Sequence, residues 1–358
     1  MHIEVAALAD LEAAEFEFPR CAVARRLADI EREALMWLWE GRIPLGKVSM
    51  LVGDPGLGKS MVTLGMAATV SRGGRWPIRG EGVAPAGDVV LVSAEDDPAD
   101  TIRPRLEAAG ADLNRVHILD GIKEVTDAGE RIKRPWNLAD LPELERLFER
   151  LPACKLLVID PVSAYLAGAD SHKNADIRAL LAPLSELAAK HKLAALAVSH
   201  LNKSQGPAIY RTTGSLAFAA AARAVYCVTK DADDPGRRIL VPIKANLAPD
   251  ASGVAYRIGT DETGTPRLEW EPDAFPVDPN EALSREPDED RSATTECAEW
   301  LRGELANGPK LAKELQREAR EAGFTDKVLR RARERLNIKP RKRDFSKGWA
   351  WELPAKMP

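Results

Sequence analysis

The sequence predicts an α/β fold built on a mostly parallel, twisted β-sheet, followed by a small basic domain. Apolar, β-rich runs alternate with helical periods through the first 230 residues or so, a pattern typical of strand–helix–strand crossovers. A charge asymmetry marks the other end of the chain. Residues 291–358 hold 17 Lys/Arg against 10 Asp/Glu, a net +7, and the total of −4 leaves −11 for the remainder. A basic end on an acidic body favours contact with nucleic acid at that end.

The alternation sets the order of the expected elements. Strands of the parallel sheet are expected at 48–52, 88–93, 155–160, 193–198 and 224–229. Helical periods lie at 141–151 and 177–190, and shorter strands at 238–243, 254–258 and 267–270 predict an antiparallel edge. We divide the chain into a lead-in (1–34, with a helical stretch that runs over 22–35), an α/β domain (35–270), an acidic, Pro-rich linker (271–291) and a basic domain (292–358).

A glycine-rich motif follows the first strand. It fits G-x-x-x-x-G-K-[ST] with the residues Gly53, Asp54, Pro55, Gly56, Leu57, Gly58, Lys59 and Ser60, and Met61 opens an apolar helix behind it. Glycines let backbone N–H groups approach phosphate oxygens, and the helix N-terminus favours an anion. Lys59 is expected to reach the β- and γ-phosphates of ATP, and Ser60 to ligate Mg²⁺. The alternative is a glycine-rich turn between a strand and a helix, but the flanking elements favour a nucleotide site.

Two acidic residues end later strands, where ligands bind in open parallel sheets. Asp160 ends the run 155–160 and is expected to hold Mg²⁺ together with Ser60. Glu95 follows the run 88–93 and is our candidate for the base that activates water. The acids 95–97 are equally suited to capping the helix that starts near Pro98, and both roles are compatible.

Two further residues complete the predicted catalytic set. The strand expected at 193–198 continues to His200 at the carboxyl edge of the sheet. An imidazole there can sense the γ-phosphate by a hydrogen bond, and a purely structural histidine is the alternative. Arg223 follows a small-residue helical stretch that begins at Gly214. It is suited either to an ion pair within the chain or to stabilising charge in the ATP site of a neighbouring copy.

Together these motifs resemble the RecA-like P-loop ATPases, and closely the RepA-type hexameric helicases of plasmid and phage replication. The resemblance covers about residues 35–260 and also rests on 102–106, 199–203 and 243–246. It implies homo-hexamers with ATP and Mg²⁺ at subunit interfaces, single-stranded DNA in a ring channel, and a separate primase or initiator as a possible partner. Arg223 matches the family's trans-acting arginine. Lys244 falls where related helicases place a trans lysine, but Asn246 stands where they have an arginine, which favours Arg223.

Residues that contact nucleic acid are expected in two regions. Segments 168–174 and 203–213 would face the channel of a ring and carry the cations Lys173, Lys203 and Arg211. The basic domain shows three helical periods and a hairpin, which resembles a winged helix-turn-helix. Its candidate DNA contacts are Lys327, Arg330, Arg331, Arg341 and Arg343. Solvated surface charge is the alternative for each cation, and a protein contact is the alternative for the domain.

Composition narrows the remaining possibilities. The four cysteines are widely spaced with no C-x-x-C pair, which argues against a zinc site and a disulfide framework. The first 18 residues are acidic and mixed, and no apolar run reaches membrane-spanning length, so we expect a cytoplasmic protein. The leading hypothesis is an ATP-driven DNA helicase. The main alternative is a nucleotide-switched DNA-binding regulator, or a repair-type RecA-like ATPase, that does not unwind DNA. A small-molecule kinase fits less well.

Overall fold

The computed structural model describes residues 24–126, 129–166, 168, 174–201, 216–231, 234–248, 252–284, 288–306, 308–336, 338, 340–344 and 348–353. The chain divides into two units, residues 1–35 and 36–358. Within the first unit, residues 24–35 form one 3-10 turn, η1 (Leu27–Asp29), so the helix expected over 22–35 is wrong for its described part. All side chains of this stretch are exposed, and a short helix with no buried face does not offset the cost of its nucleation.

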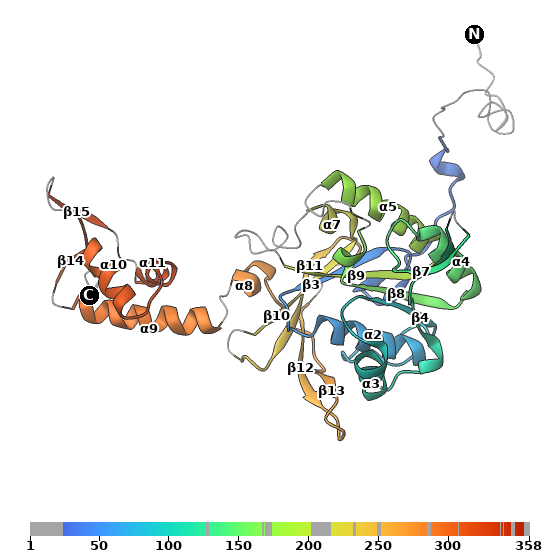
Figure 1. Ribbon diagram of the computed structural model, residues 1–358, viewed down its shortest axis with the longest axis horizontal. Coiled ribbons are helices and arrows are strands. Elements are labelled where there is room, and N and C mark those ends of the chain that lie inside the picture. Colours follow the sequence, from blue (N-terminus) through green and yellow to red (C-terminus); the bar gives the residue numbers. More distant parts are fainter. Residues whose placement is uncertain are drawn as a thin grey trace, which may run out of the picture. The chain divides into compact units, whose positions relative to one another are not determined.

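The second unit contains a nine-stranded, mainly parallel sheet, as the alternation predicts (Figure 1). The order of its strands is β13-β12-β11-β10-β3-β9-β8-β4-β5, and the six strands from β10 to β5 are parallel. The five predicted parallel strands are all present: β3 (Val48–Gly53), β4 (Asp88–Ser93), β8 (Cys154–Asp160), β9 (Ala194–His200) and β10 (Ala224–Lys230). The edge strand β5 (Val116–Ile118) is an addition, too short to show a sequence pattern.

The predicted antiparallel edge is confirmed. It consists of β11 (Arg238–Ala245), β12 (Val254–Thr260) and β13 (Pro266–Trp270). The residues that follow continue this structure: Phe275 exchanges backbone hydrogen bonds with Gly253, and Leu283 of α8 (Pro279–Ser284) is buried in the main core. Because α9 (Asp288–Glu304) begins soon afterwards, much of the stretch 271–291 that we expected to be a linker has regular structure and packing.

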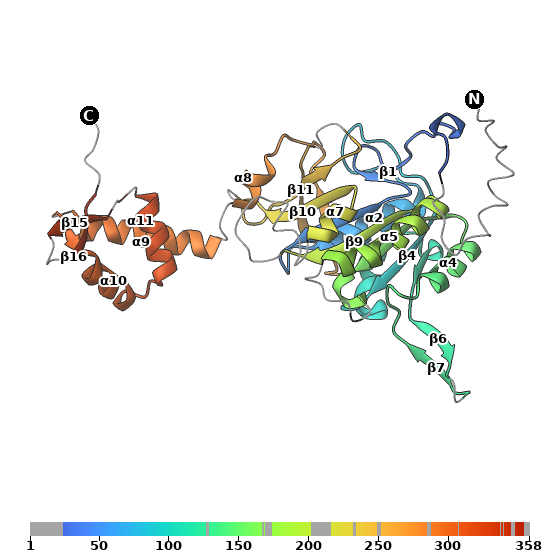
Figure 2. The ribbon, with the colours of Figure 1, turned by 90° about the horizontal axis from the view of Figure 1, so that it is seen from above.

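Helices cover both faces of the sheet (Figures 1 and 2). One face carries α2 (Lys59–Arg72) and α3 (Arg103–Ala108), which is preceded by one π-helical turn, η2 (Pro98–Ile102). The other carries α4 (Leu141–Arg150), α5 (Asn174–His191), α7 (Leu216–Ala221) and the turn η4 (Val162–Tyr165). Each face has its own apolar cluster, so alternate residues of the buried strands pack to opposite sides. These helix–sheet–helix layers fix the positions of the strand ends on which the site is built.

Smaller elements surround the sheet. The short strands β1 (Trp37–Trp39) and β2 (Ile43–Pro44) form a hairpin on the α2 side. The 3-10 turn η3 (Leu113–Arg115) precedes β5. A second hairpin, of β6 (Ile122–Val125) and β7 (Arg131–Arg134), extends from the domain in Figure 2. No helix within the described residues is both long and apolar enough to cross a bilayer. The described cysteines Cys154, Cys227 and Cys297 are buried free thiols.

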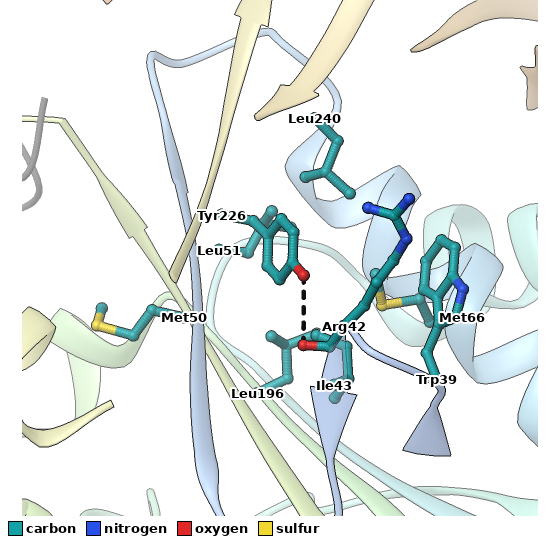
Figure 3. A pocket seen from close by; sticks show the side chains of 9 residues that line it. All are labelled: Trp39, Arg42, Ile43, Met50, Leu51, Met66, Leu196, Tyr226 and Leu240. Atoms are coloured by element: carbon teal, nitrogen blue, oxygen red, sulfur yellow. Dashed lines mark hydrogen bonds between the residues drawn. The ribbon is translucent and has the colours of Figure 1, made fainter. Parts of the chain in front are cut away.

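A small cavity lies between β1, β2, the central strands and α2 (Figure 3). Its lining is mainly apolar, and its polar groups are Arg42, the indole N–H of Trp39, which donates to Glu81, and the hydroxyl of Tyr226, which donates to the Arg42 carbonyl at 3.4 Å. The buried Arg42 guanidinium donates to Glu81 at 2.8 and 2.6 Å and to the Ser252 carbonyl at 2.7 Å. Since these polar groups already have partners, the cavity is a packing feature and not a binding site.

The C-terminal residues form a third apolar cluster of their own. Helices α9, α10 (Ala312–Glu321) and α11 (Asp326–Arg335) surround it together with a three-stranded sheet of β14 (Lys310–Leu311), β16 (Gly348–Trp351) and β15 (Arg341–Asp344). Val328, Leu329 and Ala332 of α11, with Leu336 just after it, are buried in this cluster. Thr325 caps that helix by accepting from the Val328 N–H at 3.3 Å.

Candidate nucleotide-binding site

The glycine-rich motif forms the turn between β3 and α2, and its glycines are required there. Gly56 and Gly58 have φ of 75° and 85°, a region that other residues rarely adopt. A Cβ on Gly53 would lie 2.6 Å from the Val228 carbonyl oxygen on the neighbouring strand β10. Gly58 directly precedes the first turn of α2, so the loop brings the free N–H groups of that turn to its concave side. This is a phosphate-binding geometry.

Lys59 lies at the centre of the loop. Its ammonium donates to the carbonyls of Gly53 and Asp54, each at 2.9 Å, and to Nδ1 of His200 at 3.3 Å. Burial lowers the pKa of Lys59, and the neighbouring charge of Asp160 opposes that effect. The side chain is therefore a partly desolvated cation, held where a phosphate oxygen could exchange with one of its carbonyl partners.

Ser60 and Asp160 meet at the carboxyl edge of the sheet. The Ser60 hydroxyl hydrogen-bonds to the carboxylate of Asp160, and both residues line a small cavity with Ser93 and Asp96. Burial raises the pKa of Asp160, although the Ser60 bond and the charge of Lys59 lower it. A hydroxyl and a carboxylate are oxygen ligands of the kind that Mg²⁺ takes, with phosphate oxygens and water for the rest. The described residues contain no group of three His, Cys, Asp or Glu able to hold a metal.

Three acids follow β4, which pairs with β8 so that Ser93 lies opposite Asp160. Asp96 is half-buried and forms an ion pair with Arg105 at 3.0 Å. Glu95 is exposed, and its charge acts on both Asp160 and Lys59. Asp97 caps the next helical turn by accepting from the N–H groups of Ala99 and Asp100 at 2.7 and 3.2 Å. Asp96 therefore has an ion-pair partner and Asp97 caps a helical turn, whereas Glu95 is exposed and close enough for its charge to act on Asp160 and Lys59.

His200 ends β9, and its Cα pairs with Gly53 in the register of β3 and β9. The sequence separates these residues widely, but the sheet makes them neighbours. Lys59, Ser60, Asp160, Glu95 and His200 therefore all lie at one edge of the sheet, as the motifs predict.

Arg223 lies at the opposite edge. Its backbone N–H donates to the carbonyl of Val48, the first residue of β3, at 2.9 Å, whereas the phosphate loop follows the last residue, Gly53. Five residue steps along a strand span about 16 Å, farther than an arginine side chain extends. Arg223 is exposed. It therefore does not belong to the phosphate site of its own chain.

Lys244 lies beside Arg223 and is engaged within the chain. Its ammonium donates to the carbonyls of Ala219, Ala220 and Ala222 at the end of α7, at 2.9, 3.3 and 2.8 Å. Burial lowers the pKa of Lys244, and the charge of Arg223 lowers it further.

Several predicted DNA contacts have no described side chain. Lys173, Lys203 and Arg211 lie outside the described residues. For Lys327, Arg331, Arg341 and Arg343 the structure describes only the backbone, on α11 and β15. Arg330 is exposed on α11. Arg333 on the same helix packs over the ring of Trp351, with its guanidinium carbon 5.3 Å from the ring centroid.

Sequence reasoning missed a support behind the phosphate loop. The buried Tyr256 of β12 donates its hydroxyl to the Leu57 carbonyl at 3.0 Å, and a Cβ on Gly58 would lie 2.7 Å from Cδ1 of Ile258. Strand β12 therefore fixes the back of the loop. The apolar pattern of β12 predicts which face of the strand is buried, but it does not predict that this face contacts the phosphate loop.

The model of the AAA domain matches residues 12–206, more than half of the chain. The chain belongs to the AAA-domain family. This matched range contains the phosphate loop, Glu95, Asp160 and His200, so the AAA domain accounts for a P-loop ATPase site; Arg223 and Lys244 lie beyond it. No curated protein matches the sequence.

Proposed function

We propose that this AAA-domain protein is an ATP-hydrolysing DNA motor, a helicase of the RepA type that acts as a homo-hexamer in the replication of a plasmid, phage or mobile element. The observation that carries the proposal is the position of Arg223. An exposed arginine about 16 Å along β3 from the phosphate loop cannot serve its own site, but it can serve the next copy in a head-to-tail ring.

The residues at the loop edge support ATP hydrolysis. Lys59 and the N–H groups of the loop bind the phosphates, while Ser60 and Asp160 hold Mg²⁺, which neutralises phosphate charge. Glu95 lies at the mouth of the site and orients and deprotonates the attacking water. Arg223 of a neighbouring copy stabilises the charge that develops on the transferred phosphoryl group. His200 contacts Lys59 directly and so responds to the state of the γ-phosphate.

Two regions would contact DNA. We propose that the segments with Lys173, Lys203 and Arg211 line the channel and bind single-stranded DNA. The C-terminal arrangement of three helices and a three-stranded sheet supports a winged helix. Its third helix and hairpin carry Lys327, Arg330, Arg331, Arg341 and Arg343 as phosphate or base contacts. A primase or initiator protein is a further expected partner.

A strand-displacement assay on a forked duplex tests the proposal. We expect ATP-dependent unwinding, an ATPase rate that rises with single-stranded DNA, and a mass near six chains. A protein that hydrolyses ATP and binds duplex DNA but never separates strands would instead be the nucleotide-switched regulator. An ATPase without any DNA response would exclude both DNA functions.

A further inference from the structure

Lys244 uses all of its hydrogen-bonding capacity inside its own chain. An ammonium has three N–H donors and no acceptor, and the structure provides three carbonyl acceptors, on Ala219, Ala220 and Ala222. These carbonyls belong to the last turn of α7 and the residue after it, where a helix leaves its carbonyls without internal partners. A cation in this position also interacts favourably with the helix dipole.

This cap is adjacent to Arg223, which follows Ala222 in the chain. The backbone of Arg223 is bound on both sides: its N–H donates to Val48 of β3, and its carbonyl accepts from the Asn246 N–H at 3.3 Å. Lys244 lies on β11 opposite Val225, so the strand that supplies Asn246 also supplies the cap. Three elements, β3, α7 and β11, thus converge on the main chain of Arg223 and leave its side chain exposed.

The positive charge of Arg223 lowers the pKa of Lys244, so the two cations lie close enough to repel each other. Lys244 would have to abandon three carbonyls to reach a phosphate in a neighbouring copy, whereas the side chain of Arg223 is exposed. We propose that Lys244 is a positioning residue, which closes the end of α7 and thereby aims Arg223 at the ATP site of the next subunit, and that it is not itself a second trans-acting cation. This inference rests on the proposed function of Arg223.

A double-mutant cycle on the full chain tests it, with steady-state ATPase kinetics for wild type, Lys244→Met, Arg223→Ala and the double variant. We expect kcat to fall by about 10³-fold in Arg223→Ala, the lower range for a trans-acting arginine. In Lys244→Met we expect a fall of about 10-fold at unchanged KM for ATP, because phosphate binding is untouched. The double variant should match Arg223→Ala within about twofold, because Lys244 acts through Arg223.

Lys192→Met is the matched control, since it removes an exposed lysine that directly precedes Leu193 and β9, at the same edge of the sheet, and should keep the wild-type rate. Lys244→Gln is a second variant, which keeps the test decisive if Lys244→Met fails to fold. Its amide can donate to carbonyls but carries no charge, so a positioning role predicts a higher kcat than in Lys244→Met. Thermal unfolding of each variant verifies that the chains compared are folded.

The outcomes separate this inference from the function on which it rests. Suppose that Arg223→Ala is impaired, and that Lys244→Met lowers kcat in the Arg223→Ala chain by the same factor as in wild type. Lys244 is then an independent cation and the inference is overturned, while the role of Arg223 stands. Equal losses in the Gln and Met variants lead to the same conclusion. If Arg223→Ala keeps the wild-type rate, the proposed function of Arg223 fails, and the positioning role fails with it.

Discussion

The ammonium of Lys59 donates to Nδ1 of His200 at 3.3 Å. Because an ammonium can only donate, His200 accepts through Nδ1 and carries its ring proton on Nε2. One hydrogen bond therefore joins the phosphate-binding lysine to the end of β9, although 141 residues separate the two in the chain. A phosphate that draws the ammonium away from His200 changes the partner of the imidazole.

Replacing Glu95 with Gln should separate binding from hydrolysis. The amide keeps the size of the side chain but cannot accept the proton of the attacking water, so turnover should fall by about 10²-fold or more while ATP still binds. Asp97→Asn is the matched control, because an asparagine still caps the turn that starts at Pro98. Turnover and the affinity for a fluorescent ATP analogue check this. Retained turnover in a folded Glu95→Gln chain would show that another group serves as the base.

Asp160→Asn should leave the free protein at least as stable as wild type near neutral pH. Burial raises the pKa of Asp160, so the folded state favours the protonated carboxyl. The stability that Asp160 contributes is present below its ordinary pKa and is lost as the pH rises through the raised, folded-state value. The asparagine variant should lack this part of the pH dependence.

The same variant should lose the added stabilisation by MgATP, because it no longer supplies a carboxylate ligand. Thermal melts from pH 4 to 8, with and without MgATP, measure both effects. A variant that is stabilised by MgATP as strongly as wild type would exclude Asp160 as a metal ligand.

Arg223→Ala should bind ATP but hydrolyse it poorly, and mixing should restore activity. A Lys59→Ala chain has a defective phosphate loop but an intact Arg223. In a mixed ring, some interfaces pair the intact Lys59 of one chain with the intact Arg223 of the other, so the mixture should exceed the activity of either variant alone. Subunit exchange is verified by native mass measurement. Absence of rescue in rings that do exchange would exclude a trans-acting role for Arg223.

Deleting residues 288–358 should leave basal ATPase activity largely intact, because the residues assigned to hydrolysis precede Ala248 and α9 begins at Asp288. Affinity for duplex DNA should fall. In the intact chain that affinity should depend steeply on salt, with a log–log slope of about −0.9 per phosphate neutralised. Binding titrations over a salt series measure this slope.

Within that domain, replacing Arg330, Arg331, Arg341 and Arg343 together with Ala should flatten the slope by about one for each lost contact. The control removes three exposed cations of α9 and α10, Arg302, Lys313 and Arg317, and should change the slope less. If the first variant binds with unchanged affinity and slope, the domain is a protein-contact module.

The sequence by itself determined the order of the elements and the residues of the loop edge. Parallel strands bring their carboxyl ends to one edge, so a motif at each strand end was enough to predict that Lys59, Asp160, Glu95 and His200 come together. Strong local patterns, such as the apolar run before Asp160, carry this information because they depend on residues adjacent in the chain.

Tertiary structure alone decided which side chains engage one another. Asp96 and Glu95 are neighbours of similar chemistry, and only the position of Arg105 distinguishes the paired acid from the exposed one. Likewise, Lys244 and Arg223 are both cations near one sheet edge, and only the carbonyls of α7 show that Lys244 is engaged within the chain. The contact of Tyr256 behind the loop and the absence of an α-helix over 24–35 were likewise decided by tertiary contacts and burial. These outcomes depend on contacts between distant segments and on buried area, neither of which a local sequence pattern contains.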